Sequence, residues 1–152
     1  MEVLRQITSN PIVWTAVVAW AIAQILKILI EFIQNRTFDV SRITGTGGMP
    51  SSHSSFVTSL ATAIGISEGF NSTYFAIAMA LAFIVMYDAQ GVRRQAGKQA
   101  AILNIITRLL LEKDVPIERN LKELLGHTPL QVFCGALLGI IVAIVFHQAG
   151  VI

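Results

Sequence analysis

The sequence has almost no cysteine, and this scarcity excludes whole classes of site. Cys134 is the only cysteine among 152 residues, and it lies in an apolar run. Neither a disulfide framework nor a cysteine zinc site can be built from one thiol.

Charged residues are scarce as well. Charged residues make up 13% of the chain, against about 25% in soluble domains. Hydrophobic residues make up 54%, a content that excludes intrinsic disorder. The net charge is only +2, and the few basic residues are not interleaved with aromatic ones, so no nucleic-acid partner is expected. The composition predicts one small domain, residues 1–152, embedded in a membrane.

Stretches without formal charge locate the expected spans. A spanning helix needs about 20 mostly apolar residues. The sequence predicts four, at about 11–33, 54–67, 72–88 and 128–146. The second is short, and it is either a span or a re-entrant segment that lines a polar cavity. The predicted fold class is all-α, an integral membrane helical bundle.

A more polar segment, 91–126, separates the third and fourth spans. Apolar residues recur at helical spacing over Ile102–Leu111, with charged residues following. This pattern predicts an amphipathic helix on the membrane surface or packed against the spans. After Asp114-Val115-Pro116, residues 117–125 are expected to form a short surface helix.

Four spans place both termini on one side of the membrane and segments 34–53 and 89–127 on the other. The terminal side has Arg5 as its only basic residue. The opposite side carries Arg36, Arg42, Arg93, Arg94, Lys98, Arg108, Lys113, Arg119 and Lys122. The positive-inside rule predicts that this side is cytoplasmic, in a plasma (inner) membrane.

The stretch 47–55, Gly-Gly-Met-Pro-Ser-Ser-His-Ser-Ser, has the features of an anion site. Glycines such as Gly48 let the backbone approach a ligand, and the helix that follows offers N–H groups and the hydroxyls of Ser51 and Ser52. His53 is placed to donate a proton to a group bound there. The alternative is an ordinary capped helix start, with His53 as an interfacial polar residue.

Arg93 and Arg94 follow the third span. Adjacent arginines at a membrane boundary are usually orientation markers. Here glycines flank them and Asp88 precedes them, so this carboxylate can fix one guanidinium while the other binds phosphate.

His127 opens the fourth span. Gln131 lies four residues later on the same helix face, so it can accept a hydrogen bond from one ring nitrogen and leave the other for chemistry. A capping or interface role is the usual alternative. His53, a second histidine at the start of a span on the same side, makes that alternative less attractive.

Lys27 lies inside the first span, near its cytoplasmic end. It can snorkel outward or pair with Glu31. An intramembrane lysine is otherwise a functional candidate.

Gly135 and Gly139 continue the steps of four from His127 and Gln131, so all four residues share one helix face. Small residues four apart are often read as a dimer interface. If His127 points into a pocket formed with the first two spans, the glycines must instead pack inside the protomer. Because the core is small, we expect a homodimer to form through another face.

These motifs, taken in order, carry a family resemblance. A lysine in a span, Pro-Ser-x-His, an arginine and a histidine resemble the phosphatidic acid phosphatase type 2 and vanadium-dependent haloperoxidase superfamily. Gly-Gly-Met-Pro-Ser-Ser-His-Ser, Tyr-Asp-Ala-x-Gly-Val-Arg-Arg-x-Ala-Gly and Leu-Gly-His-Thr-Pro look like its divergent small-membrane-protein branch. The resemblance covers nearly the whole chain. It implies His127 as nucleophile, His53 as general acid and base, and a set of phosphate ligands: Ser52 with the adjoining backbone, Lys27, and Arg93 or Arg94.

The sequence departs from the superfamily pattern at several points. No Arg-Pro follows the lysine, and Arg36 and Arg42 are the available substitutes. Ser52 replaces the glycine of Pro-Ser-Gly-His, and the Ser-Arg close before the histidine is missing. Gln131 stands where a carboxylate normally orients the nucleophile, and it stabilises an imidazolium less. Reduced activity, or a supporting role for Asp88, would follow.

The resemblance implies a lipid-phosphate phosphatase with a phosphohistidine intermediate, whose substrate keeps its tail in the bilayer. No cofactor is expected, and the carboxylates are too few and scattered for a two-metal site. The alternative is a non-catalytic phospholipid- or phosphate-binding membrane protein on a degenerate scaffold. An intramembrane serine protease is disfavoured because no Gly-x-Ser-Gly segment occurs.

The orientation can be tested by thiol labelling. In a Cys134→Ala background, a cysteine introduced near Lys113 should react with an impermeant thiol reagent only after the inner membrane is opened. Labelling in intact cells would contradict the cytoplasmic assignment.

Overall fold

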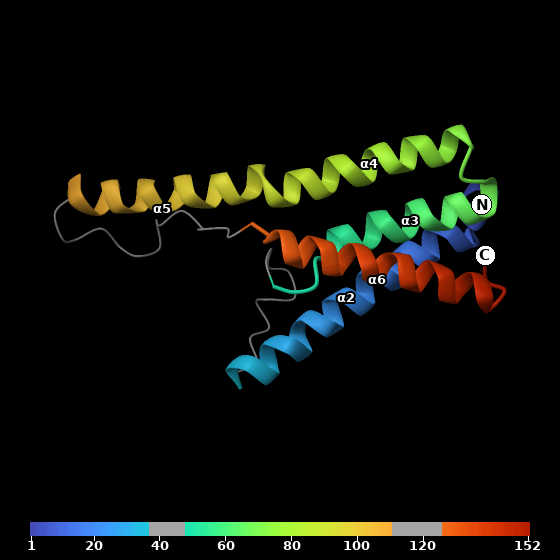
Figure 1. Cartoon of the computed structure of the whole chain (residues 1–152), viewed down its shortest axis with the longest axis horizontal. Coiled ribbons are helices and arrows are strands. Elements are labelled where there is room, and N and C mark those ends of the chain that lie inside the picture. The colour runs from blue at the N-terminus through green and yellow to red at the C-terminus, as the bar shows by residue number, and fades with distance from the viewer. Residues whose placement is uncertain (37–47, 111–125) are drawn as a thin grey trace.

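A computed structural model of the chain describes residues 1–36, 48–110 and 126–152, and within these ranges every regular element is a helix. The helices are α1 (Glu2–Thr8), α2 (Pro11–Asn35), α3 (Ser52–Glu68), α4 (Thr73–Gln90), α5 (Val92–Leu110) and α6 (Pro129–Gln148) (Figure 1). The predicted all-α class is confirmed.

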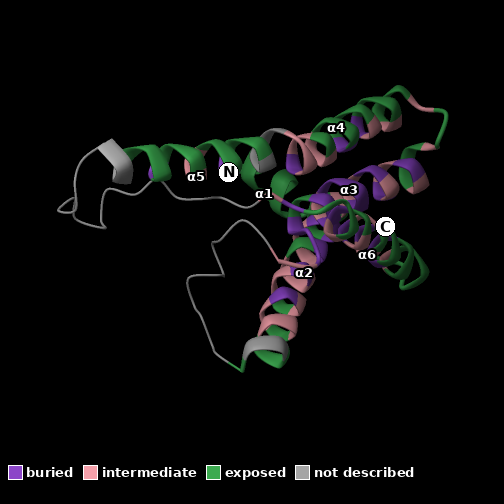
Figure 2. Ribbon diagram, turned by 60° about the vertical axis from the view of Figure 1, so that its left-hand side comes forward, coloured by how far each residue is buried: buried purple, intermediate pink, exposed green. Residues whose placement is uncertain are grey.

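Helix α3 lies at the centre of the bundle, in contact with α2, α4 and α6 (Figure 2). Its buried residues are mostly small and many are polar: Ser52, Ser54, Ser55, Val57, Thr58, Ser59, Ala61, Ala63 and Gly65. Small side chains let the neighbouring helices approach closely, and the hydroxyls find hydrogen-bond partners among them. A polar helix is thereby enclosed by three apolar ones.

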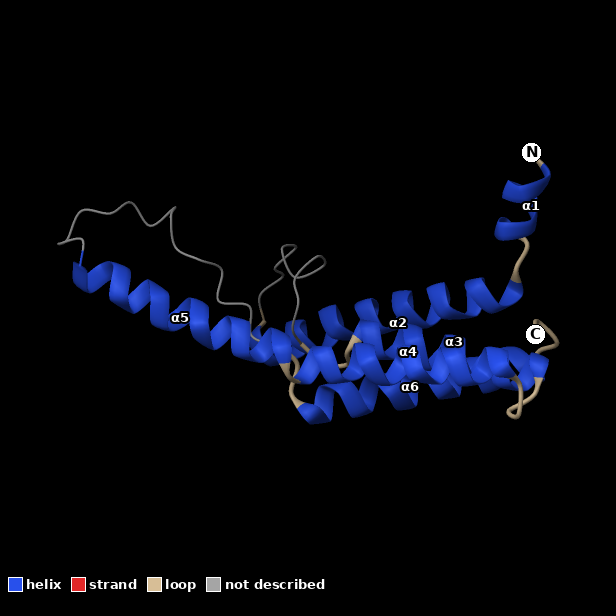
Figure 3. Cartoon of the chain, turned by 90° about the horizontal axis from the view of Figure 1, so that it is seen from above, coloured by secondary structure: helices blue, strands red, loops and turns tan. Residues whose placement is uncertain are grey.

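The four bundle helices alternate in direction, so both termini lie at one end (Figures 1 and 3). The starts of α3 and α6 lie at the opposite end, with the ends of α2 and α4. This arrangement agrees with the prediction that both termini share one side. The arrangement also brings the predicted site segments together at the end of the bundle opposite the termini.

Within the described residues, three helical stretches are long and apolar enough to cross a membrane: Pro11–Ile33, Thr73–Thr107 and Pro129–Gln148. They contain three of the four predicted spans. The fourth, α3, has 17 residues and a length of about 25 Å, short of the roughly 30 Å hydrocarbon layer. Its polar residues are accommodated because the other helices surround it.

Helix α5 differs from the expectation for the segment after the third span. It begins at Val92, ten residues before the predicted start, and runs on from α4 beyond the bundle (Figure 3). The backbone hydrogen bonds continue across the junction, because Gly91 N–H donates to the Tyr87 carbonyl (2.9 Å) and Gln95 N–H donates to the Gly91 carbonyl (3.1 Å). Gly91 therefore does not break the helix. The surface helix predicted at 117–125 lies outside the described residues.

Helix α1 was not predicted. The Trp14 indole N–H donates to the Thr8 carbonyl (2.6 Å), and the Asn10 side chain caps α2 by accepting from the N–H groups of Ile12 and Val13. These bonds fix the corner between α1 and the first span.

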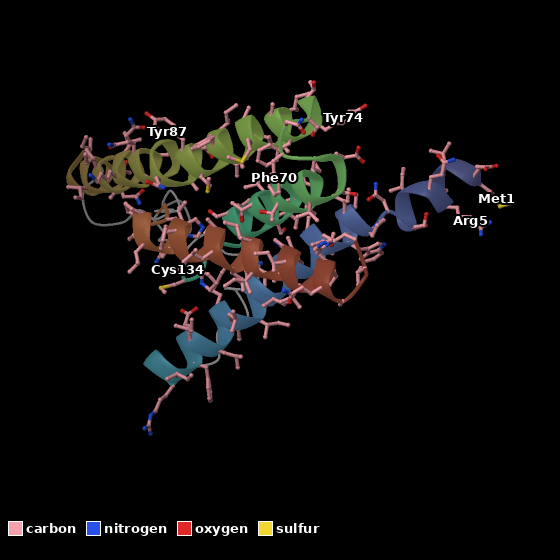
Figure 4. All side chains as sticks on the ribbon, turned by 45° about the vertical axis from the view of Figure 1, so that its right-hand side comes forward. Met1, Arg5, Phe70, Tyr74, Tyr87 and Cys134 are labelled. Carbon is pink, nitrogen blue, oxygen red and sulfur yellow. The ribbon has the colours of Figure 1, made fainter. Side chains whose placement is uncertain are left out.

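The turn between α3 and α4 is closed by aromatic packing. The Phe70 ring lies edge-on to the Phe75 ring, with centroids 5.1 Å apart, and covers Gly65. Figure 4 shows Tyr74 at the start of α4, with Phe70 between the ribbons of α3 and α4.

The backbones of α3 and α6 touch at two glycines. A Cβ on Gly135 would collide with the Ser51 carbonyl oxygen, and one on Gly139 would collide with the Ser55 carbonyl oxygen and the Thr58 hydroxyl. Thr58 also donates to the Ala136 carbonyl (3.1 Å) across the same interface. The prediction that these glycines pack inside the protomer is confirmed.

Replacing Gly135 with leucine should destabilise the fold by about 3 kcal/mol or more, the upper end of overpacking costs, because the obstacle is backbone. Thermal unfolding in detergent would measure the loss. The control is Ile141→Phe, which adds volume on the exposed face of α6 and should change little. A stable, folded Gly135→Leu monomer that has lost only a dimer would contradict the packing.

Candidate active site

The starts of α3 and α6 are joined by a backbone hydrogen bond. Ser51 N–H donates to the Gln131 carbonyl oxygen (3.0 Å), and Gly135 lies beneath Ser51. The segments around His53 and His127, more than 70 residues apart in the sequence, therefore meet at one end of the bundle.

Ser51 is the N-cap of α3 and is fully buried. Its Oγ accepts from the Ser54 N–H (3.4 Å) and from the Ser54 hydroxyl (3.0 Å). Ser52 begins the helix and is also buried. The Ser51 hydroxyl thus serves the cap in this conformation, and its binding of phosphate stays a prediction.

His127 is nearly enclosed, with 4% of its surface exposed. Its backbone N–H donates to the Ala89 carbonyl (3.1 Å), which ties the start of α6 to the end of α4. Its ring Nδ1 lies 3.2 Å from Gln131 Oε1. The sequence prediction that Gln131 contacts one ring nitrogen is confirmed.

Gln131 fixes the tautomer of His127. The Thr128 N–H donates to Gln131 Oε1 (3.1 Å), and the Gln131 N–H donates to Thr128 Oγ1 (3.4 Å), which completes a capping box. Since Oε1 can only accept, the proton between it and His127 must be on Nδ1. In the neutral ring the lone pair is then on Nε2.

His53 has a different environment, because it is exposed on the second residue of α3. It lines a cavity of about 340 Å³ with five apolar residues of α2, α3 and α4: Val17, Trp20, Phe56, Val57 and Val85. Val85 lies one turn before Ala89, the residue that holds His127. Both histidines are therefore placed against the last turns of α4.

Lys27 is buried in α2, with 4% exposed. Its alkyl chain packs on Gly48, where an added Cβ would lie 2.8 Å from Lys27 Cγ. Gly48 also has φ +82°, a backbone conformation that side chains disfavour. Lys27 thus reaches the loop before α3, as the phosphate-site prediction requires, and Glu31 is its electrostatic neighbour.

The arginine cluster is placed only in part. Asp88 is half-buried in the last turn of α4, beside Ala89. Arg93 and Arg94 lie in the first turn of α5, and their side chains are outside what the structure describes. Gly47 and Arg42 are outside it as well. Phosphate binding by either arginine, and its pairing with Asp88, stay predictions.

Some site residues escaped the sequence analysis. The Ala89 carbonyl carries no side-chain signal, and the apolar residues beside His53 look like ordinary span residues. Thr128 is different, because Thr-x-x-Gln over 128–131 is a capping-box pattern that the sequence displays.

Comparison with known proteins places this arrangement in a family context. The model of the divergent PAP2 family matches residues 8–142. The chain is also similar to the uncharacterized membrane protein YuiD of Bacillus subtilis (strain 168), at 43% identity over 93% of this chain and 96% of that protein. No solved structure matches the chain.

The tautomer of His127 can be observed directly. The ¹⁵N chemical shifts of its ring should report an Nδ1–H imidazole in the native protein. Gln131→Leu should shift the ring toward the Nε2–H form and lower stability by about 1 kcal/mol through loss of the cap bond. An Nε2–H ring in the native protein would contradict the geometry.

Proposed function

This chain belongs to the divergent PAP2 family, and on that premise we propose that it is a metal-independent lipid-phosphate phosphatase. Its scaffold is phosphatase-related, and the chain is a membrane protein with apolar helices long enough to span. The observation that carries the proposal is His127: buried, held in the Nδ1–H form by Gln131, and placed at the same bundle end as His53.

In the proposed first step, His127 Nε2 attacks the phosphorus of a lipid phosphate. The bond between phosphorus and the leaving oxygen breaks, and protonated His53 gives its proton to that oxygen. A phosphohistidine remains on His127. Neutral His53 then takes a proton from water, the resulting hydroxide attacks phosphorus, and the P–N bond breaks to release inorganic phosphate.

Charge on the transferring group would be offset by cations and dipoles. Lys27 supplies an ammonium beside the Gly48 loop, and the first turn of α3 supplies the positive end of a helix dipole. Arg93 and Arg94 complete the proposed set, with Asp88 orienting one of them. The substrate phosphate would reach the site from the cytoplasmic face of the plasma membrane.

The test is phosphate release from a panel of lipid phosphates by detergent-purified protein. His127→Ala should abolish release, and His53→Ala should reduce it by about 10²–10⁴-fold, the usual contribution of general acid–base catalysis. Gln131→Glu should keep both side-chain hydrogen bonds and maintain or raise kcat, because a carboxylate stabilises the imidazolium better. Release unaffected by His127→Ala would refute the assignment.

A second candidate is a non-catalytic phospholipid- or phosphate-binding protein, and the neutral partner of His127 is the observation that favours it. Vanadate separates the two, since it mimics five-coordinate phosphorus. A rise in melting temperature with vanadate, combined with no phosphate release from any lipid, would establish the binding role instead.

A further inference from the structure

The cavity beside His53 is a groove between α2, α3 and α4, and among the described residues that line it His53 alone can ionise. Val17 and Trp20 come from α2, Phe56 and Val57 from α3, and Val85 from α4. Its wall is thus apolar on three sides and polar at a single point, the start of α3.

The direction of this groove follows from helix geometry. Phe56 and Val57 lie one turn beyond His53, so the groove extends from the histidine about 5 Å along α3, toward the middle of the bundle. The Ser55 hydroxyl donates to the Ala19 carbonyl (3.0 Å), which holds the Val17–Trp20 turn of α2 against the same part of α3. The apolar end therefore lies at the depth of the spanning helices.

The groove is also open to the surroundings of the bundle. Trp20 is 43% exposed and His53 is exposed, although both line the cavity. A groove of this kind in a membrane protein faces hydrocarbon, so its occupant must be apolar where Val17 and Val57 line it. At His53 the same occupant meets a proton donor.

We propose that this groove binds the part of the substrate's hydrocarbon tail next to its phosphate, and that Trp20 and Val85 select among tails. The inference rests on the proposed phosphatase function, because His53 is assigned there to the leaving oxygen. A tail in the groove would leave its phosphate end at the starts of α3 and α6. Selection would act on the first few carbons of the tail, since the groove spans only about one helical turn.

Binding can be measured without turnover. Trp14 and Trp20 are the only tryptophans, and Trp14 lies six residues before Trp20 on α2, outside the residues that line the groove. In a Trp14→Phe background, Trp20 alone reports groove occupancy by fluorescence. A long-chain alkyl monophosphate brominated on its first few carbons should quench Trp20 at a mole fraction at least tenfold lower than the alcohol brominated at the same carbons.

Selection can be measured with a matched pair of variants. Val85→Phe fills the groove, whereas Ile84→Phe adds the same ring at an exposed neighbouring position of α4 that does not line it. Val85→Phe should raise KM for a long-chain lipid phosphate about tenfold, at the low end of what such pocket changes produce, and should raise KM much less for methyl phosphate, whose single carbon cannot fill the groove. It should weaken the selective quenching as well. Ile84→Phe should alter neither, and Val17→Phe is the replacement if Val85→Phe does not fold.

The outcomes separate this inference from the function on which it rests. Selective quenching without hydrolysis of any lipid would support the groove and refute the phosphatase. Equal quenching by both brominated compounds would mean that any apolar chain occupies the groove, and it would overturn the proposal. Val85→Phe acting equally on long and short substrates, or on neither, would also overturn it.

Discussion

The backbones of α3 and α6 touch at Gly135 and Gly139, and the geometry of the site depends on that contact. Because no side chain separates the two helices, Ser51, the N-cap of α3, lies close enough for its N–H to donate to the Gln131 carbonyl. That bond sets the position of one histidine segment relative to the other. A wider spacing would part them, whatever residues the two segments carried.

Gln131 links this contact to the chemistry. Its backbone carbonyl holds Ser51, its N–H and Oε1 close the Thr128 capping box, and the same Oε1 orients the His127 ring. A carboxylate at this half-buried position would place a negative charge beside the buried His127 ring, and its partial desolvation would have a cost unless it is paired. The amide keeps the orienting role without that charge. The cost is weaker stabilisation of an imidazolium on His127.

The sequence predicted the bundle because its signals are local. Apolar runs and capping residues mark α2, α4 and α6 within one to two residues at most ends, and steps of four along α6 correctly assigned Gly135 and Gly139 to the interior. The start of α5 was predicted too late, because the apolar periodicity that placed it begins only at Ile102, whereas the backbone hydrogen bonds continue from α4 across Gly91. The locations of candidate site residues could be predicted where a side chain marks them, as at His127 and Lys27, whose roles in phosphate chemistry stay predictions. They could not be predicted where a backbone atom makes the contact, as at Ala89, or where a groove needs three helices to exist, as beside His53.

The enclosure of α3 has a consequence for how the protein is made. Its buried serines and threonine would be poorly solvated in lipid. Besides its bond to the Ser54 carbonyl within α3, Thr58 has a partner on α6, Ala136, which lies 78 residues later in the chain. Until α6 has been synthesised, the polar face of α3 is not covered by that helix. Insertion of α3 into the bilayer on its own is therefore unfavourable. Stable insertion of α3 therefore requires that α6 packs against it. Since His127 directly precedes α6, the segments that carry His53 and His127 come together only when α6 packs on α3, in the same event that completes insertion of the bundle.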